Sequence, residues 1–159
     1  MSKNLKIAFF VIIGLIILSI LAGFLLTFIA GHSKDQKIFS QGSLLGMIPD
    51  GRYKGSVDFP QNAWLGKKFD RATNSGDNML SVFGKEVEKY PFTTRIEKGV
   101  HDRDLDVLVL DYNAPSNPWW LRLIRDEIVE VSPGKYLGKV HLRIIPGYPF
   151  TVGFFRLER

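Results

Sequence analysis

Cysteine is absent from the 159-residue chain. Without thiols the protein has no disulfide bond, no thiolate zinc site, no iron–sulfur cluster, no cysteine nucleophile and no lipid anchor attached through cysteine. This absence fits a location in the cell envelope but does not require one. A chain of this length is expected to form one folded domain together with any targeting segment.

Sequence motifs for catalysis are missing too. There is no Gly-x-Ser-x-Gly, no glycine-rich phosphate loop before a helix and no His-Glu-x-x-His. Zinc catalysis usually takes three protein ligands, and His32, beside the apolar N-terminal segment, is a poor partner for His101 and His141. His141 alternates with Lys139 and Arg143 on a face that the pattern predicts to be solvated. We therefore predict no catalytic residue, no metal and no cofactor.

A concentrated basic patch is also missing. The chain has 21 Lys and Arg against 16 Asp and Glu, a formal net charge of +5. Lys3 and Lys6 precede the apolar segment, so the rest of the chain holds 19 basic and 16 acidic residues, a net charge of +3. These basic residues alternate with acids, whereas nucleic-acid binders gather them in one stripe. We predict no nucleic-acid partner.

Charged residues are absent from the segment Ile7–Gly31. At about 1.5 Å per residue, a helix of this length crosses a hydrocarbon core of about 30 Å. A cleavable signal peptide would have an apolar run of about 7–15 residues that ends in a small-x-small site. Here the run is longer, and Phe28 or Ile20 stands where the first small residue would be needed. We predict that residues 1–31 form a cytoplasmic tail and an uncleaved transmembrane signal-anchor helix.

The charges that flank this segment give little guidance on its orientation. Lys3 and Lys6 precede the segment, and Lys34 and Lys37 follow it, so the positive-inside count is nearly tied. A short N-terminal tail before a single anchor favours an N-terminus in the cytoplasm. We expect a single-pass protein of the cell inner (plasma) membrane, with its domain on the extracytoplasmic or periplasmic side.

Residues 32–49 are interpreted as a tether, because polar residues are followed by the partly apolar segment IFSQGSLLGMIP. Two interpretations of the apolar side chains stay open. Leu44, Leu45, Met47 and Ile48 either lie on the membrane surface or pack under the domain.

From residue 50 the pattern is typical of β-strands. RYKGSVDF places Tyr53, Val57 and Phe59 on one face and polar residues on the other, which predicts a half-buried strand. LDVLVLDY, residues 105–112, is apolar on both faces and should be the most buried strand. The composition of ATNSGDN, residues 72–78, predicts a turn or loop. Further strands are predicted in WLGKKFD, PFTTRIEKG, EIVEV, YLGKVHLRII and FTVGFFRLE.

The predicted strand EIVEV is preceded by a helix signal and followed by a turn signal. In SPGK, Pro133 and Gly134 occupy the positions that a type II turn requires, which predicts a hairpin. Asn117 and Pro118 are suited to the N-cap and first position of one short helix. Many short strands with internal glycines predict that residues 50–159 form a small antiparallel β-barrel or sandwich, and we favour the barrel.

The opening DGRYKGSV, about eight antiparallel strands and a C-terminal arginine resemble the calycin-like barrels, which include the lipocalins. The lipocalin motif is Gly-x-Trp, whereas here Tyr53 follows Gly51-Arg52. The resemblance implies an internal cavity for an apolar ligand. The segment LDYNAPSNPWWLRLIRDEIVEVSPGKYLGK also resembles parts of small membrane-anchored bacterial envelope proteins without an assigned activity.

The candidate ligand-binding residues are Trp119, Trp120, Arg122, Arg125 and Tyr112. A short helix at a barrel mouth can act as a lid, with indoles over an apolar ligand and guanidinium groups on its carboxylate or phosphate head. The alternative is structural. One tryptophan would fill the barrel end, the other would lie at the lipid interface, and the arginines would pair with nearby acids. The sequence favours this structural alternative.

The sequence predicts a membrane-anchored, non-enzymatic binding module for an apolar or amphipathic small molecule such as a lipid or fatty acid. Its partners would be the lipid bilayer, through residues 7–31, the small molecule and a neighbouring envelope protein. Two alternatives stay open. One is a structural or assembly subunit of an envelope complex. The other is an enzyme that uses buried carboxylates, such as Asp126 with Glu127, together with Tyr112 or His101.

Overall fold

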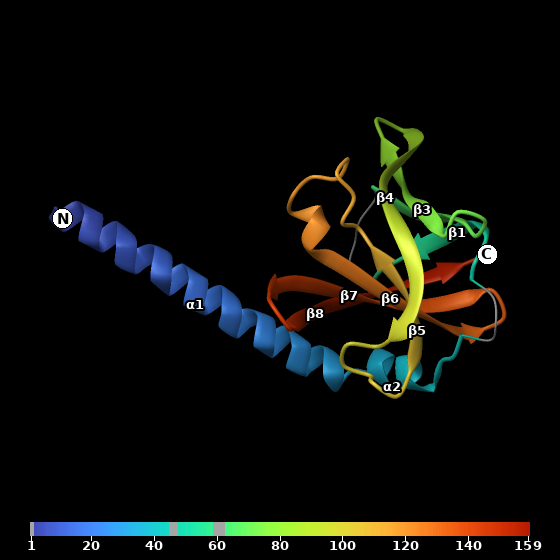
Figure 1. The fold of residues 1–159 in the computed structure, drawn as a ribbon, viewed down its shortest axis with the longest axis horizontal. Helices are drawn as coiled ribbons and strands as arrows, with labels where there is room; N and C mark the ends of the chain where they lie inside the picture. The colour runs from blue at the N-terminus through green and yellow to red at the C-terminus, as the bar shows by residue number, and fades with distance from the viewer. Residues whose placement is uncertain (1, 45–47, 59–62) are drawn as a thin grey trace.

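The computed structural model describes residues 2–44, 48–58 and 63–159. Eight antiparallel strands pair in chain order, and β8 closes on β1 to complete a barrel (Figure 1). The predicted fold, a small antiparallel barrel with an N-terminal apolar helix and one short helix, is confirmed. The elements are α1 (Lys3–Gly31), α2 (Lys34–Gln41), β1 (Gly51–Ser56), β2 (Trp64–Asp70), β3 (Ser75–Val82), β4 (Lys85–Lys98), β5 (Asp106–Asp111), the 3-10 helix η1 (Leu121–Leu123), β6 (Ile124–Ser132), β7 (Lys135–Ile145) and β8 (Tyr148–Glu158).

Strand β5 is buried on both faces, as its continuous apolar run predicted. Leu108 and Leu110 point into the barrel, where they join the interior core. Val107 and Val109 point outward and pack with Phe39 of α2. The outer side of this part of the barrel is therefore covered by a helix rather than by solvent.

The turn predicted over residues 72–78 is shorter than expected, because β3 begins at Ser75. Gly76 lies inside the strand, where an added Cβ would stand 2.3 Å from the Lys68 carbonyl oxygen and 2.5 Å from the Phe92 ring. This glycine therefore allows close packing within the sheet. Its presence beside Thr, Asn and Ser made the composition resemble a loop.

Aromatic rings fill much of the barrel interior. The rings of Tyr53 and Phe69 meet edge to face with centroids 5.7 Å apart, and Phe69 contacts Phe92 in the same way. Gly138 makes room for the ring of Phe155, which lies where a Cβ would stand. The buried core also includes Leu108, Leu110, Tyr112, Leu121, Ile128, Tyr136 and Leu157.

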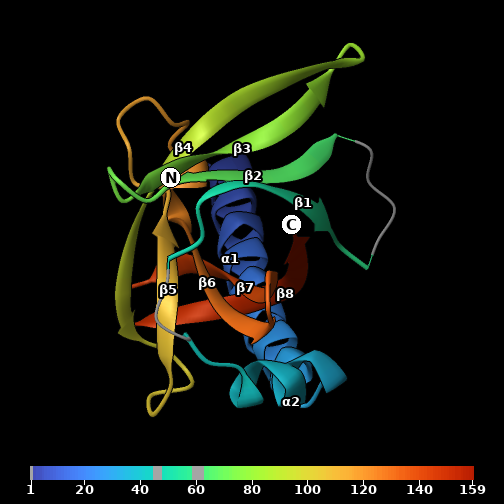
Figure 2. The ribbon, with the colours of Figure 1, turned by 90° about the vertical axis from the view of Figure 1, so that its right-hand side faces the viewer.

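The two N-terminal helices cover the outer face of the barrel at strands β6 to β8. The Phe150 ring of β8 packs directly on Gly23 of α1, and the backbone N–H of Thr151 donates to the Thr27 hydroxyl oxygen over 3.0 Å. Phe39 of α2 is fully buried against the barrel wall. Figure 2 shows α1 running behind strands β7 and β8, with α2 below the barrel.

The predicted tether contains α2, a helix that the sequence patterns did not indicate. Beyond α2, Ser43 forms an isolated antiparallel bridge with Glu130. Leu44 and Ile48 pack against the interior core, which is one of the two arrangements left open by the sequence. Leu45 and Met47 lie outside the described residues, as does Phe59, which was placed on the buried face of the first strand.

Most of α1 has no protein partner within the described part of the chain. The side chains from Leu5 to Leu21 are mainly exposed, although the segment is strongly apolar. The structure thus contains one helix that is long and apolar enough to span a membrane.

Candidate functional site

A cavity of about 300 Å³ lies inside the barrel. It opens toward the barrel end formed by the β1–β2, β3–β4, β5–β6 and β7–β8 connections, which we call the mouth end. The opening is indicated by Val57, Trp64 and Leu121, which line the cavity and lie in or beside these connections. The remaining lining residues are Lys67, Asn78, Leu80, Tyr90, Tyr112, Ile124, Asp126, Val140 and Phe155.

Four polar side chains meet at the floor of this cavity: Lys67, Asn78, Tyr112 and Asp126, which we call the inner cluster. The Lys67 ammonium donates to Asn78 Oδ1 over 3.0 Å and also to the Tyr112 hydroxyl. It lies 3.1 Å from Asp126 Oδ2 as an ion pair. The Tyr112 hydroxyl donates to the same carboxylate oxygen over 2.9 Å. The inner cluster therefore joins β2, β3 and β6 with the end of β5 across the barrel.

Aromatic rings surround the Lys67 ammonium. Its Nζ lies 5.0 Å from the ring centroid of Phe155, 5.1 Å from Tyr112, 5.3 Å from Phe92 and 5.5 Å from Trp64. Cations at this distance are attracted to the ring faces, more strongly where water is excluded. The rings therefore offset part of the free energy that burial of the ammonium costs.

The electrostatics of the inner cluster follow from its burial. Burial lowers the pKa of Lys67, and the charge of Asp126 and its hydrogen bond only partly reverse this. Burial also raises the pKa of Tyr112 well above its ordinary value, and the Asp126 charge adds to the increase. Asp126 Oδ1 is buried without a hydrogen-bond donor among the described residues. The cavity floor thus combines a buried cation with a carboxylate oxygen that lacks a donor within the described ranges.

The structure places the predicted lid residues in three different environments. Tyr112 lies at the cavity floor. The side chains of Trp119 and Trp120 are 75% and 49% exposed, so neither fills the barrel end. Arg122 is exposed and donates to Asn113 Oδ1 over 2.9 Å.

Arg125, the fifth predicted residue, does not face the cavity. It lies on the outer face of β6, where its guanidinium group pairs with Glu97 and Glu127. From the segment between Trp119 and Arg125, it is Leu121 and Ile124 that reach the cavity. The predicted helix N-cap is wrong, because the side chain of Asn117 donates to the backbone carbonyls of Pro91 and Tyr112 instead.

Sequence reasoning missed Lys67 and Asn78 of the inner cluster, and it named Asp126 only as an acid–base partner of Glu127. Lys67 is two residues before the buried Phe69 in β2, so strand alternation could have placed it inside the barrel. Asp126 is likewise two residues before the buried Ile128 in β6, so the two side chains lie on the same face of the strand. Asn78 gave no usable signal, because it lies in the segment whose composition resembled a loop.

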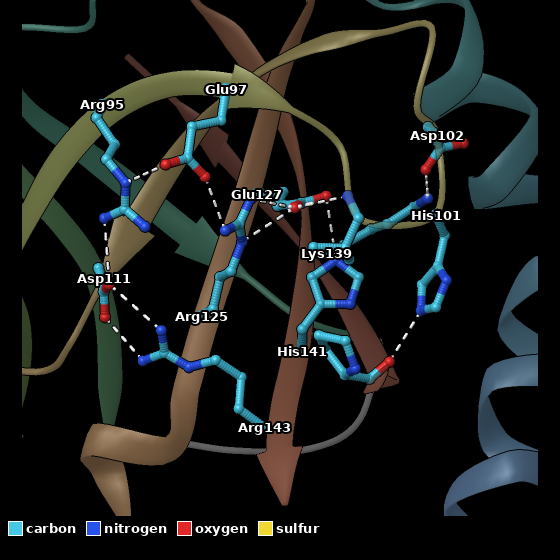
Figure 3. A network of polar contacts seen from close by, with 12 residues as sticks. Arg95, Glu97, His101, Asp102, Asp111, Arg125, Glu127, Lys139, His141 and Arg143 are labelled. Carbon is cyan, nitrogen blue, oxygen red and sulfur yellow. Dashed lines mark hydrogen bonds and ion pairs between the residues drawn. The ribbon is translucent and has the colours of Figure 1, made fainter. Parts of the chain in front are cut away.

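A second buried polar group lies on the outside of the barrel wall (Figure 3), and we call it the outer cluster. Glu127 Oε1 accepts from Arg125 over 2.9 Å and from the backbone N–H of Val100 over 3.1 Å. Glu127 Oε2 lies 3.3 Å from His141 Nε2, an ion-pair distance outside hydrogen-bond geometry. The other ring nitrogen of His141 is 3.1 Å from the Thr151 hydroxyl. The cluster continues through Lys139, Asp102, Glu97, Arg95, Asp111 and Arg143.

The prediction that His141 and Lys139 lie on a solvated face is wrong. His141 is fully buried, and Lys139 is 2% exposed. The Lys139 ammonium pairs with Asp102 and lies 4.2 Å from the ring centroid of Phe39 in α2. The helices and the β4–β5 connection cover this face, a tertiary feature that alternation within one strand does not reveal.

The charges of the outer cluster compensate one another. Burial alone would raise the pKa of the Glu127 carboxyl, but His141, Arg125 and the Val100 N–H together lower it below its ordinary value. Burial lowers the pKa of Lys139, while Asp102 opposes this shift. Among the described residues no group of three or more His, Asp or Glu side chains could hold a metal ion.

The hypothesis that Asp126 and Glu127 act together as an acid–base pair does not fit their positions. Neighbouring residues of a strand point to opposite faces of the sheet. Asp126 accordingly lines the cavity, whereas Glu127 lies in the outer cluster. The two carboxylates are separated by the barrel wall and cannot contact one substrate.

The structure shows the barrel fold. The resemblance to calycin-like barrels and to bacterial envelope proteins stays a prediction. No family model, no curated protein and no solved structure matches this chain.

Proposed function

We propose that the protein is a membrane-anchored, non-enzymatic binding module whose barrel cavity holds a small amphipathic molecule such as a fatty acid or fatty alcohol. The observation that carries the proposal is the combination of an apolar cavity with a polar floor. Ligand sites are typically apolar pockets with a few convergent polar groups. Here those groups are the ammonium of Lys67 and the carboxylate of Asp126.

The inner cluster favours a ligand with a neutral polar head. Lys67 and Asp126 already form an ion pair, so a second full charge in the cavity would not be balanced. A hydroxyl or a protonated carboxyl group that reached the floor would supply a donor to Asp126 Oδ1, the buried oxygen that has none in the described part of the chain. The apolar tail would then lie against Val57, Leu80 and Ile124.

The cavity volume restricts the size of this ligand. Drug-sized ligands occupy pockets of about 300–1,000 Å³, and the present cavity of about 300 Å³ is at the lower limit. A single hydrocarbon chain with a small head suits this space better than a lipid with two acyl chains.

Ligand titration of the full chain in lipid nanodiscs tests this proposal. Trp119→Phe and Trp120→Phe would be introduced to leave Trp64, which lines the cavity, as the fluorophore. We expect medium-chain fatty acids and alcohols to change Trp64 emission in a saturable way, and mass spectrometry to detect a co-purifying amphiphile. A titration without saturation, together with an absence of bound amphiphile, would contradict the proposal.

A pair of variants tests the role of the cavity floor. Lys67→Met with Asp126→Asn removes both charges of the inner cluster and leaves no buried ion unpaired. We expect this double variant to lose ligand binding. Lys68→Met is the matched control, because the Lys68 side chain is exposed and pairs with Glu88 on the surface. Equal binding by both variants would exclude the inner cluster from ligand recognition.

The anchoring part of the proposal is that α1 spans the plasma membrane with the barrel on the extracytoplasmic side. It is supported by the exposed apolar surface of α1. Reporter fusions at the two chain ends test the orientation. A reporter active only outside the cytoplasm should function at the C-terminus and fail at the N-terminus, and the reverse pattern would contradict this topology.

A further inference from the structure

The mouth end of the barrel carries exposed apolar side chains in its described connections. Phe83, at the tip of the β3–β4 hairpin, is fully exposed. Trp119 and Trp120 are exposed in the β5–β6 connection, and Ile144 and Tyr148 flank the β7–β8 turn. Monomeric soluble proteins rarely gather large apolar side chains in one place without a binding function.

The connections at the opposite end of the barrel have a different composition. They comprise residues 71–74, 99–105 and 132–135, with the sequences RATN, GVHDRDL and SPGK. None of the large exposed apolar side chains in the described part of the barrel lies in these three connections. The difference between the two ends therefore needs an explanation specific to the mouth end.

Helix α1 leaves the barrel at the mouth end. Phe24 of α1 contacts the rings of Tyr148 and Phe150, with centroids 5.2 Å and 5.1 Å apart. Ile144 lines a groove together with α1 residues between Ile12 and Ile20. Figure 1 shows α1 projecting past the side of the barrel that holds the β7–β8 hairpin and η1. The free part of α1 thus continues beyond the exposed aromatic residues.

The length of this free part matches a bilayer. Direct packing on the barrel is seen at Gly23, and from Lys3 to Ala22 the side chains of α1 are mainly exposed, with a groove beside Ile144 and Phe150. At about 1.5 Å per residue this stretch measures about 30 Å, the thickness of a hydrocarbon core. A bilayer around the free part of α1 would have its surface at the mouth end. Tryptophan and tyrosine favour that interface, because one side of each ring is apolar and the other carries a polar group.

We propose that the mouth end lies in the interface of the bilayer that α1 spans, with Phe83, Trp119, Trp120 and Ile144 inserted among the lipids. The occupant of this apolar surface is therefore the lipid bilayer. The cavity also opens at the mouth end, so its ligand enters from the lipid phase without crossing water. This inference depends on the proposed membrane anchoring, and it adds a second contact between the protein and the bilayer.

Quenching of tryptophan by brominated lipids tests the inference in the full chain. The background variant, Trp119→Phe with Trp120→Phe, keeps only Trp64. Phe83→Trp adds a reporter at the mouth end, and Ala72→Trp adds the matched control in an exposed turn at the opposite end. Each protein is reconstituted into phosphatidylcholine vesicles with or without bromine on the acyl chains, and the Trp64 signal is subtracted.

We expect the Phe83→Trp reporter to lose most of its emission in brominated vesicles, while the Ala72→Trp reporter keeps its emission. Retaining Trp119 in a Trp120→Phe protein gives a second reporter, without any change to Phe83, and should show the same loss. Equal emission of mouth-end and control reporters would overturn the inference. Blue-shifted emission of Phe83→Trp without quenching by bromine would also overturn it, because a protein partner rather than lipid would then cover the surface.

Carbonate extraction of the same vesicles separates this inference from the proposal on which it depends. Protein that stays in the membrane after extraction, but lacks quenching at the mouth end, would overturn the interface contact alone. Protein released by carbonate would show that α1 does not span the bilayer, and both proposals would then fail.

Discussion

Strand β6 separates two buried polar groups that have opposite characters. Asp126 belongs to the inner cluster and Glu127 to the outer cluster, although they are consecutive residues. The inner cluster lies at the floor of a cavity and keeps one carboxylate oxygen without a donor among the described residues. The centre of the outer cluster, around Glu127, His141 and Lys139, is enclosed by strands, a connection and helices. Burial of charge by itself therefore does not distinguish a binding site from a structural cross-link.

The clusters also differ in what they connect. The outer cluster links the barrel wall to the N-terminal helices, through Lys139 against Phe39 and through His141 and Thr151 to Thr27. The inner cluster links strands across the barrel interior and borders empty volume. We infer that the outer cluster stabilises the fold and the inner cluster serves a ligand. Substitutions in each cluster test this assignment of a structural role to the outer cluster and a ligand-binding role to the inner cluster.

The largest effect is expected from Glu127→Gln. The variant leaves Arg125 and His141 without the carboxylate that both contact. Loss of one partner from a buried ion pair costs about 3–5 kcal/mol, so the free energy of unfolding should fall by about this amount. Urea unfolding in nanodiscs, followed by tryptophan fluorescence, measures the change.

The control for this experiment is Glu88→Gln. Glu88 pairs with Lys68 on the exposed surface, where removal of an ion pair costs about 0–1 kcal/mol. A loss of stability in Glu127→Gln no greater than in the control would show that the outer cluster is not structural.

Lys67→Met should lower the free energy of unfolding somewhat less, by about 3 kcal/mol. Asp126 is then left without its cation but keeps the hydrogen bond from Tyr112. Adding Asp126→Asn should restore most of the stability, since no buried charge is then left unpaired. The same unfolding assay, arranged as a double-mutant cycle, measures the coupling. Additive losses in the cycle would mean that the ion pair is not formed.

The two clusters should also differ in their response to acid. The pKa of Glu127 is lowered in the folded protein, so its contribution is fully present above the ordinary carboxyl pKa of 4.5 and is lost as pH falls through the lower folded value. Stability should therefore decrease below pH 4.5. Glu127→Gln should reduce this decrease without abolishing it, because the pKa values of Glu97 and Asp111 are lowered as well.

The inner cluster should respond to alkali instead. Burial lowers the pKa of Lys67 in the folded protein. At pH values between that lowered pKa and the ordinary 10.5, Lys67 is therefore more protonated in the unfolded chain than in the folded protein. Stability then rises with pH across this interval. Urea unfolding at a series of pH values, with Lys67→Met as the comparison, measures both slopes. An acid-side slope unchanged in Glu127→Gln would contradict the assignment to Glu127.

The success of sequence reasoning differed between regions for a physical reason. Strand β5 was predicted well because a residue run that is apolar on both faces has no stable position except between two covered surfaces. Lys139 and His141 were placed wrongly because alternation separates the two faces of a strand but does not show which elements cover them. That cover comes partly from α2, whose single fully buried apolar residue, Phe39, gave no periodic signal.

The candidate site was harder to predict than the fold. A buried lysine contradicts the usual tendency of charged residues to be exposed, so Lys67 was not recognised although its spacing from Phe69 was informative. Trp119 and Trp120 were predicted as ligand-binding residues because of their large side chains and their position beside Pro118. The smaller Leu121, next in sequence, lines the cavity together with Ile124.

The smallest effect is expected where the outer cluster reaches α1. Thr27→Val removes the hydroxyl that accepts the Thr151 N–H, and such a hydrogen bond contributes about 0.5–1.5 kcal/mol net. Ser19→Ala is the control, because the Ser19 hydroxyl bonds only within α1, to the Leu15 carbonyl. Hydrogen exchange of the Thr151 amide should accelerate in Thr27→Val and stay unchanged in Ser19→Ala. Unchanged exchange in both variants would show that α1 is not fixed to the barrel by this bond. The position of the mouth end relative to the bilayer would then depend on the packing of Gly23 and Phe24 against β8.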